Sequence, residues 1–360
     1  MRNFGPIYIQ AAAQVSIQQP LSDEWMIQPV SYDDVFVEAI NPNYRDFLAA
    51  NEARRMGKLM KRALVVAKSV LQETHTEHPD AIITGTCLGS LDYTVRLLDE
   101  LADHGEETTV SPTFFMQSTH NTVGSTLGIY TKSHGYNVTY SHDAVSFDMA
   151  LRDAFLQLRL GKIATALVGG YEEMVASYFD LLRQTGYVGQ EGMVPCSETS
   201  VAMLLTSRLP SPDSCLPTPD SCLQSPASLC ELAGVRLLHQ PDDSVLDREI
   251  TRLYADAGLT IGETTALLLG VNGCQENDRQ YLEIARKHFP GVRLLQYKNL
   301  FGENYCVSGL GIYAAAMCLK RQMIPSSMSF GDSQQTAPPQ SILLLNISGG
   351  REVSMILLKG

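Results

Sequence analysis

The sequence predicts an α/β protein made of two similar halves. Strand-like apolar segments alternate with amphipathic helical segments between residues 53 and 170, and the same alternation returns after residue 240. Alternation of this kind favours parallel sheets covered by helices on both faces. A segment rich in Pro and Ser, 210–230, lies between the two stretches. We therefore expect a pseudo-duplicated fold, with an N-terminal half over 1–209, a linker or loop over 210–230 and a C-terminal half over 231–360.

The elements of the N-terminal half follow from the spacing of its apolar residues. Helices are expected where apolar residues recur at three- and four-residue steps. Strands are expected where short apolar or alternating runs end in glycines or turn residues. On these grounds we predict helices at 53–73, 91–101 and 148–160, and strands at 81–84, 136–140 and 163–170.

The C-terminal half repeats this order. We predict helices at 243–257, 277–289 and 306–320, strands at 265–272 and 292–297, and two strands within 341–359 around Ser348-Gly349-Gly350. The linker contains a small tandem repeat in which Pro-Asp-Ser-Cys-Leu occurs twice, ending at Leu216 and Leu223. Its two cysteines could form a redox or metal clip, but the composition favours a solvated connector.

Composition and charge exclude several classes of function. The 360 residues carry a net charge of -12, with a pI of about 5.1, which argues against a nucleic-acid surface. No apolar run is long enough for a membrane helix, and glutamines interrupt the N-terminal segment, so we expect no membrane association and a cytoplasmic location. The eight cysteines form no CxxC pairs and have no histidines at metal spacing. We therefore expect free thiols and neither metal nor cofactor.

A series of short motifs runs along nearly the whole chain. The first half contains Gly85-Thr86-Cys87-Leu88-Gly89-Ser90, Ser111-Pro112-Thr113-Phe114-Phe115 and Gly192–Leu205, and the second half contains Val271-Asn272-Gly273-Cys274, Lys298–Glu303 and Asn346–Gly350. In order and spacing they resemble the β-ketoacyl synthases, the condensing enzymes of fatty-acid and polyketide synthesis. More narrowly, the runs SPTFFMQSTHNTVGSTLGI and VSFDMALRDAF resemble the short synthase-like proteins of aryl-polyene and flexirubin-type pigment clusters. Several of those proteins act as chain-length factors.

The resemblance implies a thiolase-like fold. Two pseudo-repeated βαβαβαββ halves would stack into a layered α-β-α-β-α structure. It also implies a reaction in which a thiolate at the N-terminus of a buried helix takes up an acyl group. Two histidines then donate hydrogen bonds to the enolate that forms when a malonyl unit loses carbon dioxide. A lysine just before the second histidine completes the electrostatics.

The residues that carry this chemistry in the family are replaced in this chain. Counting back from Asp153-Ala154-Phe155 puts the nucleophile position at Ala144, and alanine cannot hold a thioester. By the same resemblance, the first histidine position is Cys274 and the second is Glu303, whose negative charge is the wrong sign beside an enolate. Only Lys298 and Gly302 are retained. We therefore expect no catalytic residue in this chain.

Other residues invite a catalytic interpretation less strongly. Cys274 could be a relocated nucleophile, although a small buried residue after a strand is the simpler interpretation. Cys87 lies in the glycine turn, where a packing role is favoured. Ser141-His142-Asp143 are consecutive, so their side chains should not converge into a triad. Ser146 has no evident base nearby, and His120 and His142 are better explained as structural histidines.

The interactions expected at the second histidine position leave alternatives open. Glu303 and Lys298 most simply form an ion pair that fills the vacated site. A decarboxylase or thioesterase using Cys274 and Glu303 is the enzymatic alternative. It is weakened by Ala144, because decarboxylating relatives usually carry glutamine there. A third possibility is a homodimeric acyl-binding scaffold.

The resemblance finally implies partners. A chain of this kind would pair with an active ketosynthase through the strand predicted at 136–140, and would limit product length by shaping the end of the acyl tunnel. An acyl carrier protein would deliver the substrates. Carrier proteins are acidic, as this chain is, so we expect the carrier to dock mainly on the active partner.

Overall fold

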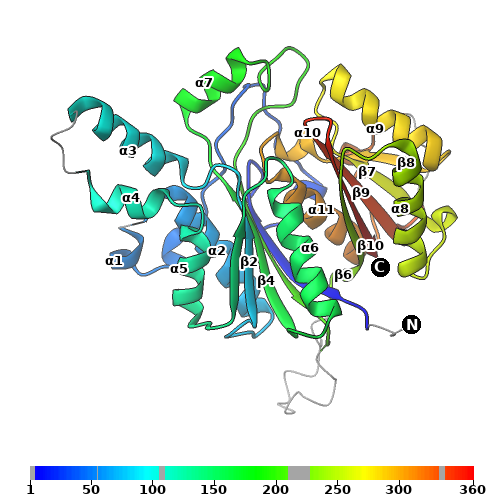
Figure 1. The fold of residues 1–360 in the computed structure, drawn as a ribbon, viewed down its shortest axis with the longest axis horizontal. Helices are drawn as coiled ribbons and strands as arrows, with labels where there is room; N and C mark the ends of the chain where they lie inside the picture. Colours follow the sequence, from blue (N-terminus) through cyan, green and yellow to red (C-terminus); the bar gives the residue numbers. More distant parts are fainter. Residues whose placement is uncertain (1–4, 55, 105–109, 210–227, 332–336) are drawn as a thin grey trace.

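The molecule is built around one continuous ten-stranded sheet (Figure 1). The computed structural model describes residues 5–54, 56–104, 110–209, 228–331 and 337–360. The strand order is β3-β2-β4-β5-β1-β6-β10-β9-β7-β8. The strands are β1 (Tyr8–Val15), β2 (Ala81–Gly85), β3 (Tyr136–Tyr140), β4 (Thr165–Glu172), β5 (Thr199–Thr206), β6 (Cys230–His239), β7 (Ala266–Leu269), β8 (Arg293–Gln296), β9 (Ser341–Ser348) and β10 (Glu352–Lys359).

The two halves of the sheet repeat each other. Strands β1 to β5 are arranged 3-2-4-5-1, and β6 to β10 follow the same arrangement, 8-7-9-10-6, from the opposite edge. In each half three strands run parallel, while β5 and β10 pair antiparallel with their neighbours. The halves join where β1 pairs antiparallel with β6, at Tyr8–Glu231 and Ile9–Cys230. The predicted pseudo-duplicated α/β fold is confirmed.

The helices form layers on and between the two halves of the sheet. Helix α2 packs on β1, β4 and β5, whereas α8 and α9 pack on β6 and β9. Between the halves lie α6, which contacts β2, β4 and β6, and α11, which contacts β1, β5 and β9 (Figure 1). The α-helices are α1 (Ala50–Ala53), α2 (Lys58–Glu73), α3 (Leu91–His104), α4 (Pro112–Ser118), α5 (Thr122–Thr131), α6 (Ser146–Arg159), α7 (Ala176–Gln184), α8 (Asp243–Asp256), α9 (Gln275–His288), α10 (Lys298–Phe301) and α11 (Val307–Arg321).

Three of the apolar clusters in the described residues correspond to the three helical layers. The central core joins α6 and α11 to strands from both halves, and each outer core belongs to one half. Every residue of α11 from Val307 to Leu319 is buried, as expected for a helix that is apolar on all sides. Close packing explains its small residues: a Cβ on Gly309 would lie 2.6 Å from the Val201 side chain. The layered α-β-α-β-α arrangement follows from this burial.

Most predicted elements are present, with boundaries shifted by a few residues. The strand predicted at 136–140 matches β3, and the helix predicted at 53–73 begins at Lys58 as α2, after the short α1. Strands β1 and β6 and helices α4, α5 and α7 were not predicted. The predicted linker lies outside the described residues except for 228–230, and Cys230 already begins β6. None of the helices in the described ranges is long and apolar enough to cross a membrane.

Candidate functional site

The loop between β3 and α6 carries the predicted nucleophile position. Ala144 is buried, and its carbonyl oxygen accepts a hydrogen bond from Asn346 Nδ2 at 3.0 Å. The same amide donates to Asp148 Oδ2, in the first turn of α6, at 2.8 Å. Asn346 lies near the end of β9, so one side chain from the C-terminal half fixes the start of α6. This arrangement brings the Asn346–Gly350 turn next to the predicted nucleophile position.

The predicted ion pair is present and buried. Lys298 Nζ lies 2.8 Å from Glu303 Oε2, and both side chains are at most 5% exposed. Asn272 Nδ2 donates to the same oxygen at 2.8 Å. Glu303 therefore lies in a site where a cation and an amide already satisfy its carboxylate. Gly302 is required just before it, because its φ is 75° and a Cβ there would lie 2.5 Å from Ser197 Cβ.

Cys274 joins this cluster through Asn272. It is half-buried at the N-cap of α9, and its backbone N–H donates to Asn272 Oδ1 at 3.0 Å. The two ends of the Asn272 amide thus connect Cys274 to Glu303. The structure therefore brings together three of the predicted positions, Cys274, Lys298 and Glu303.

Two stacked tyrosines lie close to Asp143, in the loop before α6, and to Glu303. The rings of Tyr187 and Tyr305 are 5.5 Å apart and nearly parallel, at 18°. Burial raises the pKa of the Tyr187 phenol, and the negative charges of Glu303 and Asp143 raise this pKa further. Burial also raises the pKa of Tyr305, with Asp143 among the charges that add to the effect. The carboxylates of Glu303 and Asp143 therefore act on the same phenol.

Cys87 is a thiol that interacts with the predicted nucleophile loop, since its carbonyl oxygen accepts a hydrogen bond from Ser141 Oγ. Burial raises the pKa of its thiol to about 12, and the charges of Glu172 and Asp143 contribute, while a backbone hydrogen bond from Asp143 lowers it. Because the thiolate is the nucleophile, a thiol with this pKa is a poor one at neutral pH. The six cysteines within the described ranges are all free.

Glu172 anchors the turn that contains Cys87. Its carboxylate accepts hydrogen bonds from the backbone N–H groups of Cys87 at 2.7 Å and Leu88 at 3.0 Å. The side chain is buried, and burial raises its pKa to about 8. Cys306 Sγ, at the start of α11, lies 3.6 Å from Glu172 Oε2. Glu172 is the last residue of β4, and a charged residue at the end of an apolar strand is a signal that the sequence offers for such a site.

The consecutive Ser141, His142 and Asp143 do not form a triad. Ser141 Oγ donates to Cys87 O at 3.2 Å, whereas His142 Nε2 lies 3.6 Å from Glu352 Oε1. Ser146 is also occupied structurally: its hydroxyl donates to Asp143 O at 2.7 Å and accepts from the His142 N–H at 2.8 Å. The Ser146 hydroxyl thus holds the turn before α6, and the three consecutive side chains do not converge, as expected from their positions in the sequence.

His120 has a structural contact as well, since its Nε2 lies 3.0 Å from Cys87 O. The sequence did not predict Asp143 as a separate group, nor the stacked Tyr187 and Tyr305. Tyr187 gave no signal, because it lies in an irregular segment after α7 and reaches the site only through the tertiary fold. In the part of the chain that the structure describes, no cluster of three or more His, Cys, Asp or Glu residues is arranged to hold a metal ion.

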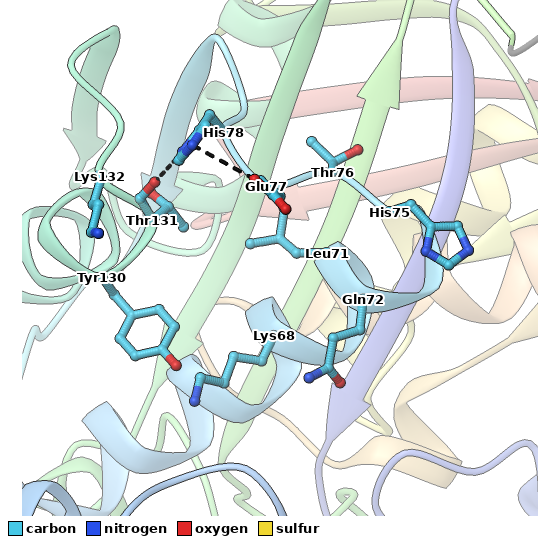
Figure 2. Close-up of a pocket in the computed structure, with 10 residues that line it drawn as sticks. All are labelled: Lys68, Leu71, Gln72, His75, Thr76, Glu77, His78, Tyr130, Thr131 and Lys132. Carbon is cyan, nitrogen blue, oxygen red and sulfur yellow. Dashed lines mark hydrogen bonds and ion pairs between the residues drawn. The ribbon is translucent and has the colours of Figure 1, made fainter. Parts of the chain in front are cut away.

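A separate surface pocket of about 530 Å³ lies between the C-terminal ends of α2 and α5 (Figure 2). Its polar groups already have structural contacts: Lys68 Nζ lies 4.2 Å from the centre of the Tyr130 ring, and His78 Nδ1 lies 2.6 Å from Thr131 O. None of the predicted site residues lines this pocket. The predicted catalytic positions therefore belong to a different part of the molecule.

Solved structures with this fold match the chain over nearly its whole length. The ishigamide ketosynthase/chain length factor matches with a TM-score of 0.81 at 15% identity, covering 99% of each chain. The ketosynthase ApeO in complex with its chain length factor ApeC, from Xenorhabdus doucetiae, matches with a TM-score of 0.75 at 15% identity, covering 100% of this chain and 99% of the other. The AntDE:AntF complex of a type II PKS acyl-carrier protein with its ketosynthase matches with a TM-score of 0.76 at 12% identity, covering 99% of this chain and 100% of the other.

Together, the fold and the arrangement of the site define a thiolase-fold protein of the ketosynthase class. The family model for the β-ketoacyl synthase N-terminal domain matches residues 25–225, more than half of the chain. The chain therefore belongs to the β-ketoacyl synthase family, and the resemblance seen in the sequence is confirmed. No curated protein matches the sequence.

Proposed function

We propose that the chain is a non-catalytic subunit of the chain-length-factor type, which pairs with an active ketosynthase in polyene, polyketide or fatty-acid-like chain elongation. The observation that carries the proposal is the buried pair of Lys298 and Glu303. A condensing site needs a hydrogen-bond donor for the enolate at the position of Glu303. Here that position holds an acceptor, and the adjacent cation is already paired with it.

The lack of a reactive thiol at the nucleophile position supports the same proposal. Ala144 has no nucleophilic group, and the high pKa of Cys87 keeps it protonated at neutral pH. The alternative decarboxylase or thioesterase would use Cys274 with Glu303 as its base. Because Glu303 already accepts hydrogen bonds from Lys298 and Asn272, its carboxylate is not available as a free base. We therefore favour a partner role over altered catalysis.

The edge of the sheet at β3 offers a surface for the partner. Strand β3 is the first in the sheet order, and β2 alone pairs with it among the described strands. Helices α5 and α6 pack against β3, and α4 packs against α5. These helices expose large apolar side chains: Phe115, Met116, Ile129, Tyr130, Leu156 and Leu160. An unpaired edge flanked by exposed apolar groups is typical of an interface.

The proposed partner is therefore a second synthase-type chain that adds its own strand beside β3. The similar structures support this choice, because they include a ketosynthase in complex with its chain length factor. The net charge of -12 disfavours direct docking of an acidic carrier protein on this chain. We propose that the carrier binds mainly to the active partner.

Co-expression with a synthase that has an intact Cys-His-His set tests the proposal. We expect a one-to-one heterodimer by size and mass, and acyl elongation that requires this chain even after Cys274→Ala substitution. A stable homodimer that ignores every synthase would favour the scaffold alternative. Turnover of malonyl carrier by this chain alone, lost on Cys274→Ala substitution, would contradict the proposal.

A further inference from the structure

We propose that Asp143, rather than Ala144, presents its side chain at the acyl-acceptor position of the site. The inference rests on the proposed function, because it names the group that replaces the lost nucleophile. The backbone gives the first argument. Asp143 has a φ of 47°, in the left-handed region that aspartate tolerates better than most residues. It lies in the tight turn from β3 into α6, where such a backbone directs the side chain away from the helix that follows.

The contacts of the carboxylate give the second argument. Asp143 Oδ2 accepts a hydrogen bond from Ser348 Oγ at 2.8 Å. Ser348 belongs to the Asn346–Gly350 turn, which resembles the glycine turn of the family. The methyl group of Ala144 is buried instead, and its carbonyl group is occupied by Asn346. The polar side chain that meets the turn is therefore that of Asp143.

Convergence with the rest of the site gives the third argument. The negative charge of Asp143 acts on Cys87, Tyr187 and Tyr305, and Tyr187 also lies in the field of Glu303. Asp143 therefore lies near the glycine turn after β2, and Tyr187 lies near both Asp143 and Glu303. Counting back from Asp153 gives Ala144 because the count assumes that the turn before α6 has the same number of residues as in the family. A shift of one residue within the turn reconciles the sequence with the geometry.

Alkylation of introduced cysteines tests this assignment on the isolated chain. In a Cys87→Ala, Cys274→Ala background, D143C and A144C would each be treated with iodoacetamide and with chloroacetyl-pantetheine, and the modified peptides quantified by mass spectrometry. We expect Cys at 143 to react about ten-fold faster than Cys at 144, because only the former faces the site. Equal rates, or faster reaction at 144, would overturn the assignment.

An isosteric variant provides a second readout that does not depend on the cysteine variants folding. Burial and the charge of Glu172 are the larger causes of the raised Cys87 pKa, and Asp143→Asn removes the further contribution of the Asp143 charge, so alkylation of native Cys87 at pH 8.5 should accelerate severalfold. Ala144→Ser is the matched control and should leave this rate unchanged. If Asp143→Asn did not accelerate alkylation of Cys87, the Asp143 carboxylate would lie away from the site and the assignment would be wrong. Neither readout needs a partner, so failure of heterodimer formation would disprove the proposed function without touching this assignment.

Discussion

Arg62 and Glu198 form an ion pair in the interior of the N-terminal half. Arg62 Nη1, on α2, lies 2.7 Å from Glu198 Oε2, and the two side chains are 1% and 3% exposed. Glu198 also accepts the backbone N–H groups of Ala39 at 2.9 Å and Met174 at 3.3 Å. One buried carboxylate thus connects α2 with two separate loops, just before β5 begins.

Removing one member of this pair should destabilise the fold strongly. Arg62→Ala would leave the Glu198 charge buried without its cation, at a cost of about 3–5 kcal/mol in the free energy of unfolding. Lys58→Ala is the control, because the Lys58–Glu38 pair is more than half exposed and is expected to contribute about 0–1 kcal/mol. Urea unfolding followed by circular dichroism measures both. Equal losses in the free energy of unfolding would show that burial does not determine how much an ion pair contributes to stability.

The pair of Lys298 and Glu303 should matter for stability rather than for chemistry. Lys298→Met leaves Glu303 with Asn272 but without a cation in a buried site, so we expect a loss of about 3–5 kcal/mol. Replacing both residues, Lys298→Met with Glu303→Gln, should recover much of this loss because no buried charge remains. Thermal and urea unfolding of the single and double variants compare these costs. A double variant as unstable as Lys298→Met would contradict a purely electrostatic cause.

Glu172 should make the fold less stable as pH rises. Its folded-state pKa is raised from 4.5 to about 8, so folding favours its protonated form. The stability that this group contributes is complete below pH 4.5 and is lost as pH rises through about 8. The loss is on the order of a few kcal/mol. Unfolding free energies between pH 5 and pH 9 should show a downward contribution that Glu172→Gln removes.

Asp148 provides a matched comparison for that experiment. Burial raises its pKa from 3.8 to about 6, so its contribution has the same sign in a lower pH window. Asp148→Asn should therefore remove only the part of the pH dependence that Asp148 contributes, between its ordinary pKa of 3.8 and about 6, and keep the Glu172 part, which runs from pH 4.5 to about pH 8. If Asp148→Asn abolished the dependence up to pH 8, Glu172 would not be its origin.

The apolar surface beside β3 should control pairing with a synthase. Ile129, on α5, is 80% exposed, and Ile129→Glu should weaken the heterodimer at least tenfold, because a charge would be buried at the interface. Ile27 is also 80% exposed, but it precedes α1 and belongs to none of the helices beside β3. Ile27→Glu is therefore the control. Analytical ultracentrifugation of the co-expressed complex compares them. Equal weakening by both variants would argue against an interface at β3.

The sequence predicted the layers better than the details of the site. Helix α11 and strand β3 were found because their composition and alternation are strong local signals. Strand β1 was missed because glutamines lie at buried positions: Gln14 is fully buried, with its amide donating to the carbonyl of Gln19 at 2.7 Å. Such pairing is set by the tertiary structure, so a pattern of hydrophobicity cannot show it.

The same limit applies to the site. The family resemblance located Lys298 and Glu303 five residues apart, on either side of one short helix, α10, and its C-cap Gly302. The role of Asp143 depends on one backbone dihedral angle, and that of Tyr187 on a ring stacked against a residue from the other half. Neither leaves a trace in residue periodicity. The replacement of the residues that carry chemistry in the family was therefore visible in the sequence, whereas the positions and contacts of Asp143 and Tyr187 were not.

The way the two halves share their interior has a consequence for how the chain folds. The central core takes its side chains from both halves, while in the described part of the chain the sheet joins the halves at the short pairing of Tyr8–Glu231 and Ile9–Cys230. A half expressed alone would therefore expose the inner face of its sheet to water. We expect the intact chain to unfold in one cooperative transition, and two separately expressed fragments to become soluble only when they are allowed to assemble with each other.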